Sequence, residues 1–255
     1  MGIGMRTEQN YRVRILLFFA IGIVVGVAFS QLFASVIQPS LASSLSVEQM
    51  YEKAIDDAVI VKPSEIYSGL TPIVETNLNL SWRGESGNKS VLVVAWTKYN
   101  SSYPVGETVN TTWGDTWVTV VPEIKTFFKD YVDPNSNLTL RVKQLLGLPS
   151  NSSNLYFVEL WVNPQSLFRP TPDNEVDDTV AQLTFPSSAT AAYMEWFNNN
   201  IIYSYFPPRY PWTRLGYTYD WGNSGSHVGL SEFVLVQYSM VIVESVTPTL
   251  DYLYS

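Results

Sequence analysis

The residues best suited to acid–base chemistry lie close together near the C-terminal end of the chain. His227 is the single histidine, and it lies between Asp220 and Glu232 in the sequence. Near neutral pH an imidazole serves as a general base, with Glu232 orienting it or acting as a carboxylate catalyst. Arg214 and Tyr219 would then bind an anionic substrate. The spacing forms no nucleophile elbow, so the alternative is that these side chains have structural roles.

A second group of chemically interesting residues is acidic. Asp173, Glu175, Asp177 and Asp178 place four carboxylates in a six-residue segment. Carboxylate oxygens suit a hard cation such as calcium, but the EF-hand pattern fails because Asp178 stands where that loop needs glycine and Thr184 where it needs glutamate. We therefore expect a solvated acidic turn and no metal site. Without cysteine, and with one histidine, zinc and copper sites are disfavoured, and no glycine-rich phosphate loop indicates a nucleotide cofactor.

Residues 203–221 are rich in aromatic side chains, with eight aromatics, three prolines and two arginines in 19 positions. The prolines rule out a continuous helix or a central strand, so the segment should be stiff and largely irregular. Flat rings with polar edges suit a carbohydrate, a protein partner or the membrane interface, and the alternative is a loop folded over the core. The residues proposed for a binding surface are Tyr205, Tyr210, Trp212, Tyr217, Tyr219 and Trp221.

Part of this segment has a recognisable pattern. Residues 211–223 read PWTRLGYTYDWGN and residues 228–234 read VGLSEFV, and together they resemble a signature of exported prokaryotic proteins of uncharacterised function. The upstream pieces QLLGLP at 144–149 and LFRP at 167–170 belong to the same pattern, so the resemblance covers roughly the last 120 residues. It implies an exported globular domain and supplies neither an activity nor catalytic residues.

Asparagine glycosylation motifs mark a different part of the chain. The Asn-x-Ser/Thr pattern occurs at Asn79, Asn88, Asn100, Asn110, Asn137 and Asn151. All six lie between residues 79 and 151, and none lies in the last 104 residues. Because glycans need solvent-facing acceptors, these sites predict surface positions on one half of the chain and leave the other half bare. The alternative is that a surface rich in Ser, Thr and Asn produces the motif incidentally.

Strands and helices must position these residues. Short β-branched and aromatic runs predict strands at 90–96, 117–121, 155–162, 233–238 and 240–246. Helical spacing and capping residues predict helices at 46–58, 122–132, 139–146 and 188–202. The first helix begins with a capping box of Ser46 and Gln49, and its apolar stripe either packs within the domain or binds a partner. Ser187 or Ser188 is the expected cap of the last helix, and Gly147 ends the third.

Composition indicates that residues 46–255 form one folded domain. Hydrophobic residues make up 46% of the sequence, which is ample for a core, while charged residues are only 15%. The absence of cysteine excludes a disulfide scaffold and a thiol enzyme, and the net charge of −8 argues against nucleic-acid binding. No repeat or long linker interrupts residues 46–255, so we expect a single mixed, strand-rich α+β domain.

The N-terminal region is basic and then apolar. Residues 1–14 carry three arginines and one glutamate, a net charge of +2, which leaves −10 for the rest. The apolar run at 15–37 would span roughly 34 Å as a helix, enough to cross a hydrocarbon core of about 30 Å. Basic residues on its N-terminal side predict a cytoplasmic tip, a transmembrane anchor at 15–37, a stalk at 38–45 and an extracellular domain. The alternative is a secretory signal cleaved after Ala28-Phe29-Ser30, and both readings export the domain.

These features support three functions of different classes. The first is a non-enzymatic, single-pass cell-membrane protein whose extracellular domain contacts a protein partner through its aromatic C-terminal half, as a cell-surface or accessory domain. The second is an exported enzyme that acts on cell-envelope material through Glu232 and His227. The third is a surface carbohydrate-binding module built on the aromatics of 203–221. We predict the first function, with no cofactor and no nucleic-acid partner.

Overall fold

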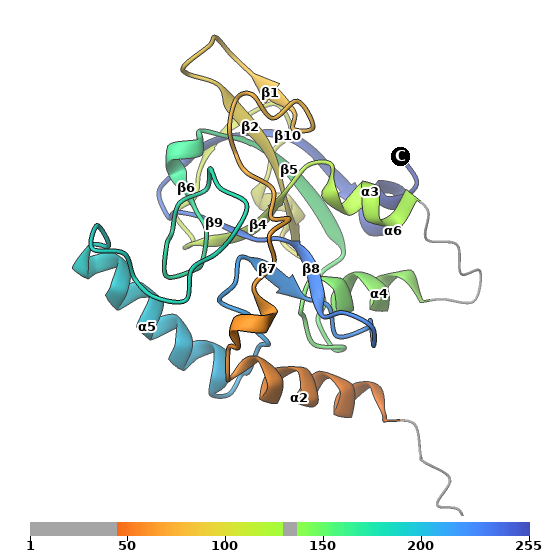
Figure 1. The fold of residues 1–255 in the computed structure, drawn as a ribbon. Coiled ribbons are helices and arrows are strands. Elements are labelled where there is room, and N and C mark those ends of the chain that lie inside the picture. The colour runs from red at the N-terminus through yellow and green to blue at the C-terminus, as the bar shows by residue number, and fades with distance from the viewer. Residues whose placement is uncertain (1–44, 130–136) are drawn as a thin grey trace, which may run out of the picture. The chain divides into compact units, whose positions relative to one another are not determined.

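An antiparallel sheet organises the domain (Figure 1). The computed structural model describes residues 45–129 and 137–255, and Leu45–Ser255 forms one compact unit. Its strands are β1 (Trp82–Arg83), β2 (Ser90–Thr97), β3 (Thr108–Asn110), β4 (Thr116–Val120), β5 (Tyr156–Val162), β6 (Leu167–Phe168), β7 (Tyr217–Tyr219), β8 (Val228–Ser231), β9 (Phe233–Leu235) and β10 (Met240–Pro248). The main sheet has the order β3-β10-β5-β2-β4-β9-β6, β1 pairs with β2, and β7 pairs with β8 in a second sheet. The fold is therefore α+β, as expected.

The central strands are buried on both faces, which explains their nearly continuous apolar sequences. In β2, Val91, Val93 and Ala95 belong to one core cluster, while alternate residues such as Leu92 and Val94 belong to another. The first cluster consists mainly of side chains from β2, β4, β5, β9 and β10. The second cluster joins the opposite face of the sheet to helices.

Five α-helices complete the described part of the chain. They are α2 (Val47–Ala58), α3 (Glu123–Lys129), α4 (Leu138–Leu145), α5 (Ala191–Tyr205) and α6 (Thr249–Leu253), with 3-10 turns at Pro63–Glu65, Asn100–Ser102 and Pro164–Ser166. Helices α3, α4 and α6 contribute Ile124, Val142 and Tyr252 to the second core cluster. Figure 1 shows these three helices on the same side of the main sheet.

Helix α2 packs against the rest of the domain. This is the first of the two alternatives for its apolar stripe, the other being contact with a partner. The capping box is present, because the Gln49 amide N–H donates to the Ser46 hydroxyl and the Ser46 N–H donates to the Gln49 side chain. On the apolar stripe, Tyr51 and Ile55 pack against Trp221, with the Tyr51 and Trp221 ring centroids 5.6 Å apart. The apolar stripe of α2 is therefore buried in the domain, where it packs against Trp221 in the segment that follows β7.

Two predicted elements differ from the structure by three residues at an end, which is more than the other predicted elements do within the described residues. The expected helix at 188–202 begins at Ala191 and is capped by Thr190, because the turn from Pro186 to Ala189 takes up the two serines. It ends at Tyr205, where Phe206 adopts an extended conformation before Pro207. The expected strand at 233–238 ends at Leu235, because the chain turns toward β10 through Tyr238, which has a φ of 66°.

The membrane anchor and its flanking segments lie outside the described residues. Within 45–129 and 137–255, no helix combines the length and the hydropathy that crossing a bilayer requires. The predicted segments at 1–14, 15–37 and 38–44 fall in the part that the structure does not describe, as do residues 130–132 of the expected helix at 122–132.

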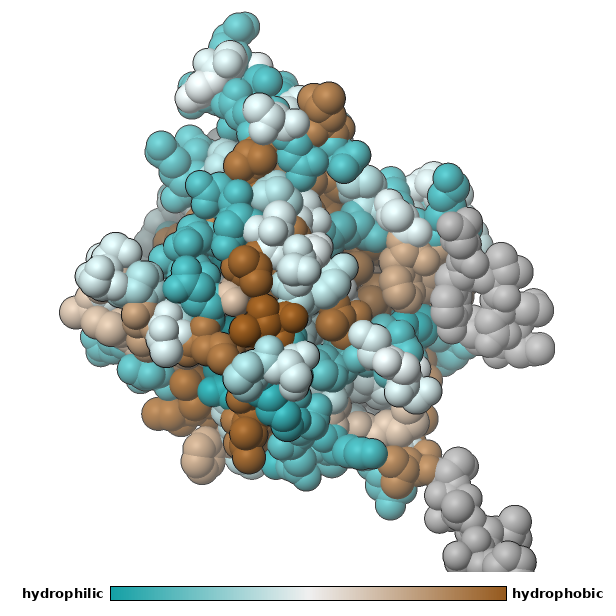
Figure 2. Space-filling view, viewed as in Figure 1, coloured by the Kyte–Doolittle hydropathy of each residue, from teal (hydrophilic) through white to brown (hydrophobic). Residues whose placement is uncertain are grey.

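Hydrophobic residues reach the surface where α2 and α5 end beside each other. The hydroxyl of Tyr205, the last residue of α5, donates to the Ala58 carbonyl at the end of α2, at 3.1 Å. Around this junction Ile60, Ile202 and Phe206 are exposed. Figure 2 shows hydrophobic surface in this region, in contrast with the more hydrophilic surface over β1 and β2.

Candidate functional site

Glu232 occupies the break between β8 and β9, and the local backbone directs it away from its neighbour Ser231. The Glu232 N–H donates to the Gly216 carbonyl at 2.9 Å, which fixes this point of the chain. Side chains alternate in direction along an extended chain. Ser231 accordingly lines a cavity that contains Glu123, whereas Glu232 lines a different cavity beside α5.

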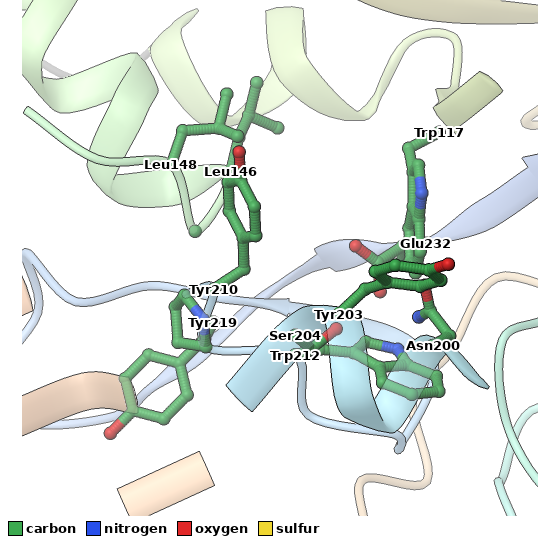
Figure 3. Close-up of a pocket in the computed structure, with 12 residues that line it drawn as sticks. Trp117, Leu146, Leu148, Asn200, Tyr203, Ser204, Tyr210, Trp212, Tyr219 and Glu232 are labelled. Carbon is green, nitrogen blue, oxygen red and sulfur yellow. The ribbon is translucent and has the colours of Figure 1, made fainter. Parts of the chain in front are cut away.

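The Glu232 cavity has a volume of about 390 Å³ and largely aromatic and aliphatic walls. Its lining residues come from β4, the chain after α4, α5 and the segments around 211, 219 and 232: Trp117, Leu146, Gly147, Leu148, Asn200, Tyr203, Ser204, Tyr210, Pro211, Trp212, Tyr219 and Glu232. Figure 3 shows Tyr210 with Leu146 and Leu148 on one side, and Glu232 with Tyr203, Asn200, Trp117 and Trp212 on the other. Its size is at the small end of the range of about 300–1,000 Å³ that is typical of ligand pockets.

Three polar side-chain atoms of this lining are shielded from solvent and have no hydrogen-bond partner within the described residues. They are Oε2 of Glu232, Nδ2 of Asn200 and Nε1 of Trp212. A buried polar group without a partner costs about 1–3 kcal/mol, so proteins rarely leave three of them in one place. These two donors and this carboxyl belong to side chains that line one cavity, where a ligand can supply partners that the described residues do not.

The carboxyl of Glu232 is tuned toward its neutral form. Burial raises the pKa of Glu232 to about 8, because the charged form loses its hydration and receives no compensating donor. The side chain as a whole is partly exposed because it faces the cavity, while its Oε2 is shielded. At neutral pH the protonated carboxyl offers both a donor and an acceptor to a bound molecule.

The cavity around Glu123 is larger, at about 520 Å³, but its carboxylate is satisfied by the protein. Glu123 accepts hydrogen bonds from the hydroxyl of Thr71, from the Thr119 hydroxyl at 3.2 Å and from the Ser231 N–H at 2.8 Å. Burial raises the pKa of Glu123, and these donors oppose that rise. A carboxylate with this many protein donors is a structural bridge between α3, β4 and β8.

His227 and Glu232 do not form the catalytic pair that the enzyme alternative needs. Nε2 of His227 lies 3.1 Å from the Tyr217 hydroxyl, and the imidazole stacks on the Tyr219 ring with centroids 4.9 Å apart. The four residues of β8 separate His227 from Glu232, which at about 3.3 Å per residue amounts to roughly 16 Å. Asp220, the other acid considered, forms a buried ion pair with Arg141. The two side chains do not pair because the extended strand β8 lies between them.

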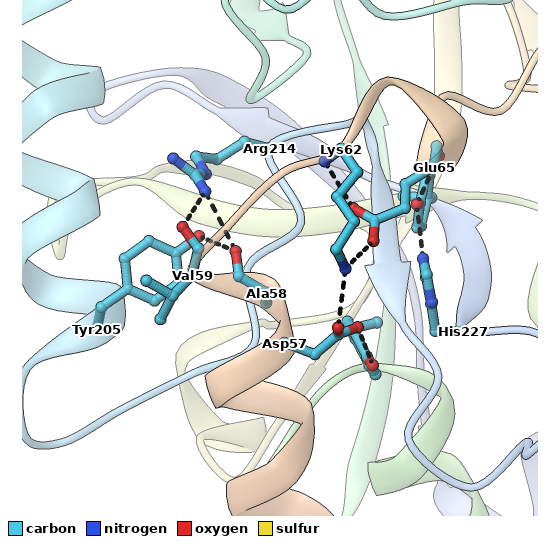
Figure 4. Close-up of polar contacts among 10 residues, drawn as sticks. Asp57, Ala58, Val59, Lys62, Glu65, Tyr205, Arg214 and His227 are labelled. Atoms are coloured by element: carbon cyan, nitrogen blue, oxygen red, sulfur yellow. Dashed lines mark hydrogen bonds and ion pairs between the residues drawn. The ribbon is translucent and has the colours of Figure 1, made fainter.

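His227 instead belongs to a polar network against α2, part of which Figure 4 shows. The Tyr219 hydroxyl donates to Asp57 at 2.9 Å, and Lys62 bridges Asp57 and Glu65 at 3.1 and 2.7 Å. Burial alone would raise the pKa of Asp57, but the hydrogen bonds from Tyr219 and Lys62 lower it. Tyr219 thus anchors the end of α2 through its hydroxyl and also lines the Glu232 cavity.

Arg214 has a structural role and not the anion-binding role that the enzyme alternative gives it. Its guanidinium donates to the carbonyls of Ala58 and Val59 at 3.2 and 2.8 Å, and it lies over the Tyr205 ring (Figure 4). These carbonyls end α2, where a cation is favourable because of the helix dipole. Arg214 is therefore corrected from a substrate-binding residue to a cap of α2.

The six aromatic residues proposed as a binding surface do not share one face. Trp212, Tyr217 and Trp221 are buried, Tyr205 and Tyr219 are partly buried, and Tyr210 is exposed. Trp221 packs on α2, and the Tyr217 hydroxyl donates to the Glu65 carbonyl. Of the six, Tyr210, Trp212 and Tyr219 line the cavity. Tyr205 and Trp221 pack in the cluster that contains α2, and Tyr217 packs in a cluster with Leu70 and Leu215.

The acidic segment and the glycosylation motifs occupy other parts of the domain. Asp173, Glu175 and Asp178 converge, so the expected solvated turn is partly buried, while Asp177 stays exposed outside their cluster. The acceptor residues Asn79, Asn88, Asn100, Asn110, Asn137 and Asn151 are all exposed. Their exposure meets the requirement for modification, and glycosylation itself stays a prediction.

Comparisons with known proteins give no indication of function, so the function is inferred from the geometry of the cavity. No family model, no curated protein and no solved structure matches this chain. The resemblance of residues 211–223 and 228–234 to exported prokaryotic proteins therefore stays an expectation.

Sequence reasoning found Glu232, Trp212, Tyr210 and Tyr219 but missed most of the opposite wall. Asn200, Tyr203 and Ser204 share one face of α5 because residues three and four positions apart are neighbours on a helix. That face carries an asparagine beside aromatic residues, which is the one local signal available. Trp117 in β4 had no signal of its own, since tryptophan is common in strands.

Proposed function

We propose that this protein is a non-enzymatic binding protein whose domain holds a small neutral ligand, such as a single sugar ring, in the Glu232 cavity. The observation that carries the proposal is that Glu232, Asn200 and Trp212 line one aromatic cavity and that each has a buried polar atom (Oε2, Nδ2 and Nε1) without a partner among the described residues. A sugar hydroxyl both donates and accepts, so a few hydroxyls would complete all three groups. The carbon faces of a sugar ring would stack on the aromatic walls.

The charge of the cavity favours a neutral ligand. None of its lining residues is basic, and its one acidic side chain is largely protonated at neutral pH because the pKa of Glu232 is raised to about 8. An anionic ligand would therefore meet no counterion, and a cation would meet a mostly neutral carboxyl. A polar but uncharged molecule leaves no unpaired charge in the site.

The same geometry disfavours the hydrolytic alternative. Most glycoside hydrolases place two carboxyl groups on either side of the scissile bond, about 5–10 Å apart. Among the lining residues of this cavity, Glu232 is the only carboxylic acid and no histidine is present. One neutral acid without a second acid or base supports binding rather than bond cleavage.

The proposal includes an outward-facing, membrane-anchored location. The apolar run at 15–37 with its preceding arginines supports an anchor with a cytoplasmic N-terminus. The six exposed acceptor asparagines between 79 and 151 support an extracellular domain that is glycosylated. A sugar-binding domain at the cell surface would contact envelope glycans or the glycan of a partner protein, which joins the partner-binding and carbohydrate-binding predictions.

Tryptophan fluorescence tests the proposal because Trp117 and Trp212 line the cavity. The full-length protein, purified in a detergent without a sugar headgroup, would be titrated with glucose, galactose, mannose and N-acetylglucosamine. We expect saturable fluorescence changes with at least one of these sugars. Trp212→Phe, which removes the indole donor, and Glu232→Gln should each weaken binding about threefold to tenfold, as expected for one hydrogen bond.

A matched control separates cavity binding from general effects on fluorescence. Trp113→Phe changes an exposed tryptophan outside the cavity and should leave the affinity unchanged. Thermal unfolding of each variant would verify that the fold is intact. Silence across all four sugars, or equal affinity in Trp212→Phe, Glu232→Gln and Trp113→Phe, would show that the cavity does not bind sugars.

A further inference from the structure

The loop that follows β6 folds three acidic side chains toward one point. One carboxylate oxygen from each of Asp173, Glu175 and Asp178 lies within 4.8 Å of the other two. Backbone hydrogen bonds hold this loop, because the Ile73 N–H donates to the Val176 carbonyl at 2.7 Å and the Arg169 N–H donates to the Asn174 carbonyl at 3.1 Å. The backbone that carries the three acidic residues is therefore held by the fold.

Asp173 supplies an independent indication of a ligand. Its side chain is buried, with 1% exposure of the residue, and its Oδ1 accepts from the Gln182 N–H at 2.9 Å. Its Oδ2 has no hydrogen-bond partner among the described residues. A buried carboxylate oxygen without a donor is costly unless a proton or a cation compensates it.

The charges around the cluster do not cancel. Arg169 is fully buried and donates to Oδ1 of Asp178, and it also donates to the carbonyls of Thr71 and Asp178 at 3.2 and 2.9 Å. One carboxylate is sufficient to balance this guanidinium, so the other two leave a net charge of −2. No lysine, arginine or histidine occurs from residue 170 to residue 208, so this stretch of sequence supplies no second counterion.

The chemistry of the cluster favours calcium among the hard cations. One calcium ion, with calcium–oxygen distances of about 2.3–2.6 Å, can contact three oxygens that lie within 4.8 Å of one another. Calcium accepts irregular sets of carboxylate ligands, whereas magnesium requires near-ideal octahedral geometry and keeps several of its waters. The exposed side chain of Glu175 provides the route by which a hydrated ion enters.

We propose that Asp173, Glu175 and Asp178 bind one calcium ion. The ion gives Asp173 Oδ2 the partner that it lacks among the described residues. The ion balances the charge of −2 that remains after Arg169 has neutralised one of the three carboxylates. It also ties the loop to the segment from Thr71 to Ile73, because Arg169 and Val176 both contact that segment. The site is independent of the Glu232 cavity and takes no part in sugar binding.

Terbium luminescence tests this site with a probe that replaces calcium. The Tyr193 hydroxyl donates to the Thr171 carbonyl at 2.5 Å, two residues before Asp173, so this ring lies close enough to pass excitation to bound terbium. Full-length protein stripped of metal with a chelator should show sensitised terbium emission that calcium chloride abolishes. Magnesium chloride at the same concentration should displace far less terbium.

Two variants make the test specific. Glu175→Gln removes the charge of an exposed ligand and should weaken calcium binding about tenfold or more while the fold stays intact, because affinity follows ligand charge. Asp177→Asn removes another exposed charge two residues away, outside the cluster, and should change affinity less than about threefold. Absence of sensitised emission, equal displacement by magnesium, or equal loss in both variants would overturn the proposal.

Discussion

Glu123 and Glu232 are two shielded glutamates in neighbouring cavities, and they differ in what the protein offers them. Glu123 accepts from Thr71, Thr119 and the Ser231 N–H, so its carboxylate joins three elements. Oε2 of Glu232, which follows Ser231 directly in the chain, accepts from no group in the described residues. Burial raises the pKa of both, but only Glu123 has donors that oppose the rise. The comparison teaches that the satisfied acid stabilises the fold, whereas the unsatisfied acid faces a ligand.

The pH dependence of stability gives the largest test of this difference. The pKa of Glu232 is raised to about 8, so between its ordinary value and pH 8 the folded protein keeps a proton that the unfolded chain releases. Stability should therefore fall as the pH rises through this window. We expect the free energy of unfolding, measured by urea titration, to fall on the order of 3 kcal/mol from pH 5 to pH 7.5, since one pKa unit corresponds to about 1.4 kcal/mol.

The variant Glu232→Gln isolates this contribution, because Glu123 also titrates and adds a slope of the same sign. Glutamine keeps the shape of the side chain but cannot ionise, so the variant should be more stable than the natural protein at pH 7.5 and similar at pH 5. If both proteins show the same pH slope, the raised pKa of Glu232 and its proposed neutral state are wrong.

Glu123→Gln should have the opposite effect on stability. The amide keeps one acceptor oxygen and turns its NH₂ toward donors that need an acceptor, among Thr71, Thr119 and Ser231. We expect a loss of about 2 kcal/mol in the free energy of unfolding at pH 7, since each unsatisfied buried group costs about 1–3 kcal/mol. The exposed Glu107→Gln is the matched control and should change stability by less than about 0.5 kcal/mol. Equal stability of Glu123→Gln and Glu107→Gln would show that the Glu123 carboxylate does not stabilise the fold.

Most of the longer elements of the fold were predictable because their patterns are local, whereas the short strands β1, β3, β6, β7 and β8 were not predicted. The β-branched run at 90–96 and the capping box of Ser46 act over a few residues, and both appear where expected. The boundary errors have local causes too, since Thr190 competes with Ser187 and Ser188 as a cap and a turn ends β9 after Leu235. Strand order was not predictable, because no feature within a strand specifies which distant strand becomes its neighbour.

The candidate site was only half predictable for a related reason. The residue types of Trp212 and Glu232 make them candidates from the sequence alone. Asn200 and Trp117, which line the same cavity, come from α5 and β4, and no local pattern connects them with the other two. His227 and Glu232 are close in sequence but not in space, because the strand between them is extended and holds its ends apart. The sequence also could not show which aromatic rings α2 would cover.

Thr71→Val is the smallest change that sharpens the comparison. It removes one hydroxyl donor from Glu123 and keeps the β-branched shape, so the carboxylate loses stabilisation while the packing stays the same. We expect a loss of about 1 kcal/mol in the free energy of unfolding and a further rise in the pKa of Glu123, because one opposing donor is gone. Thr126→Val, on the exposed side of α3 in the same cavity, is the control and should change little. Sugar affinity in the Glu232 cavity should be unaffected by either variant, and a parallel loss of binding would mean that the two glutamates share one site.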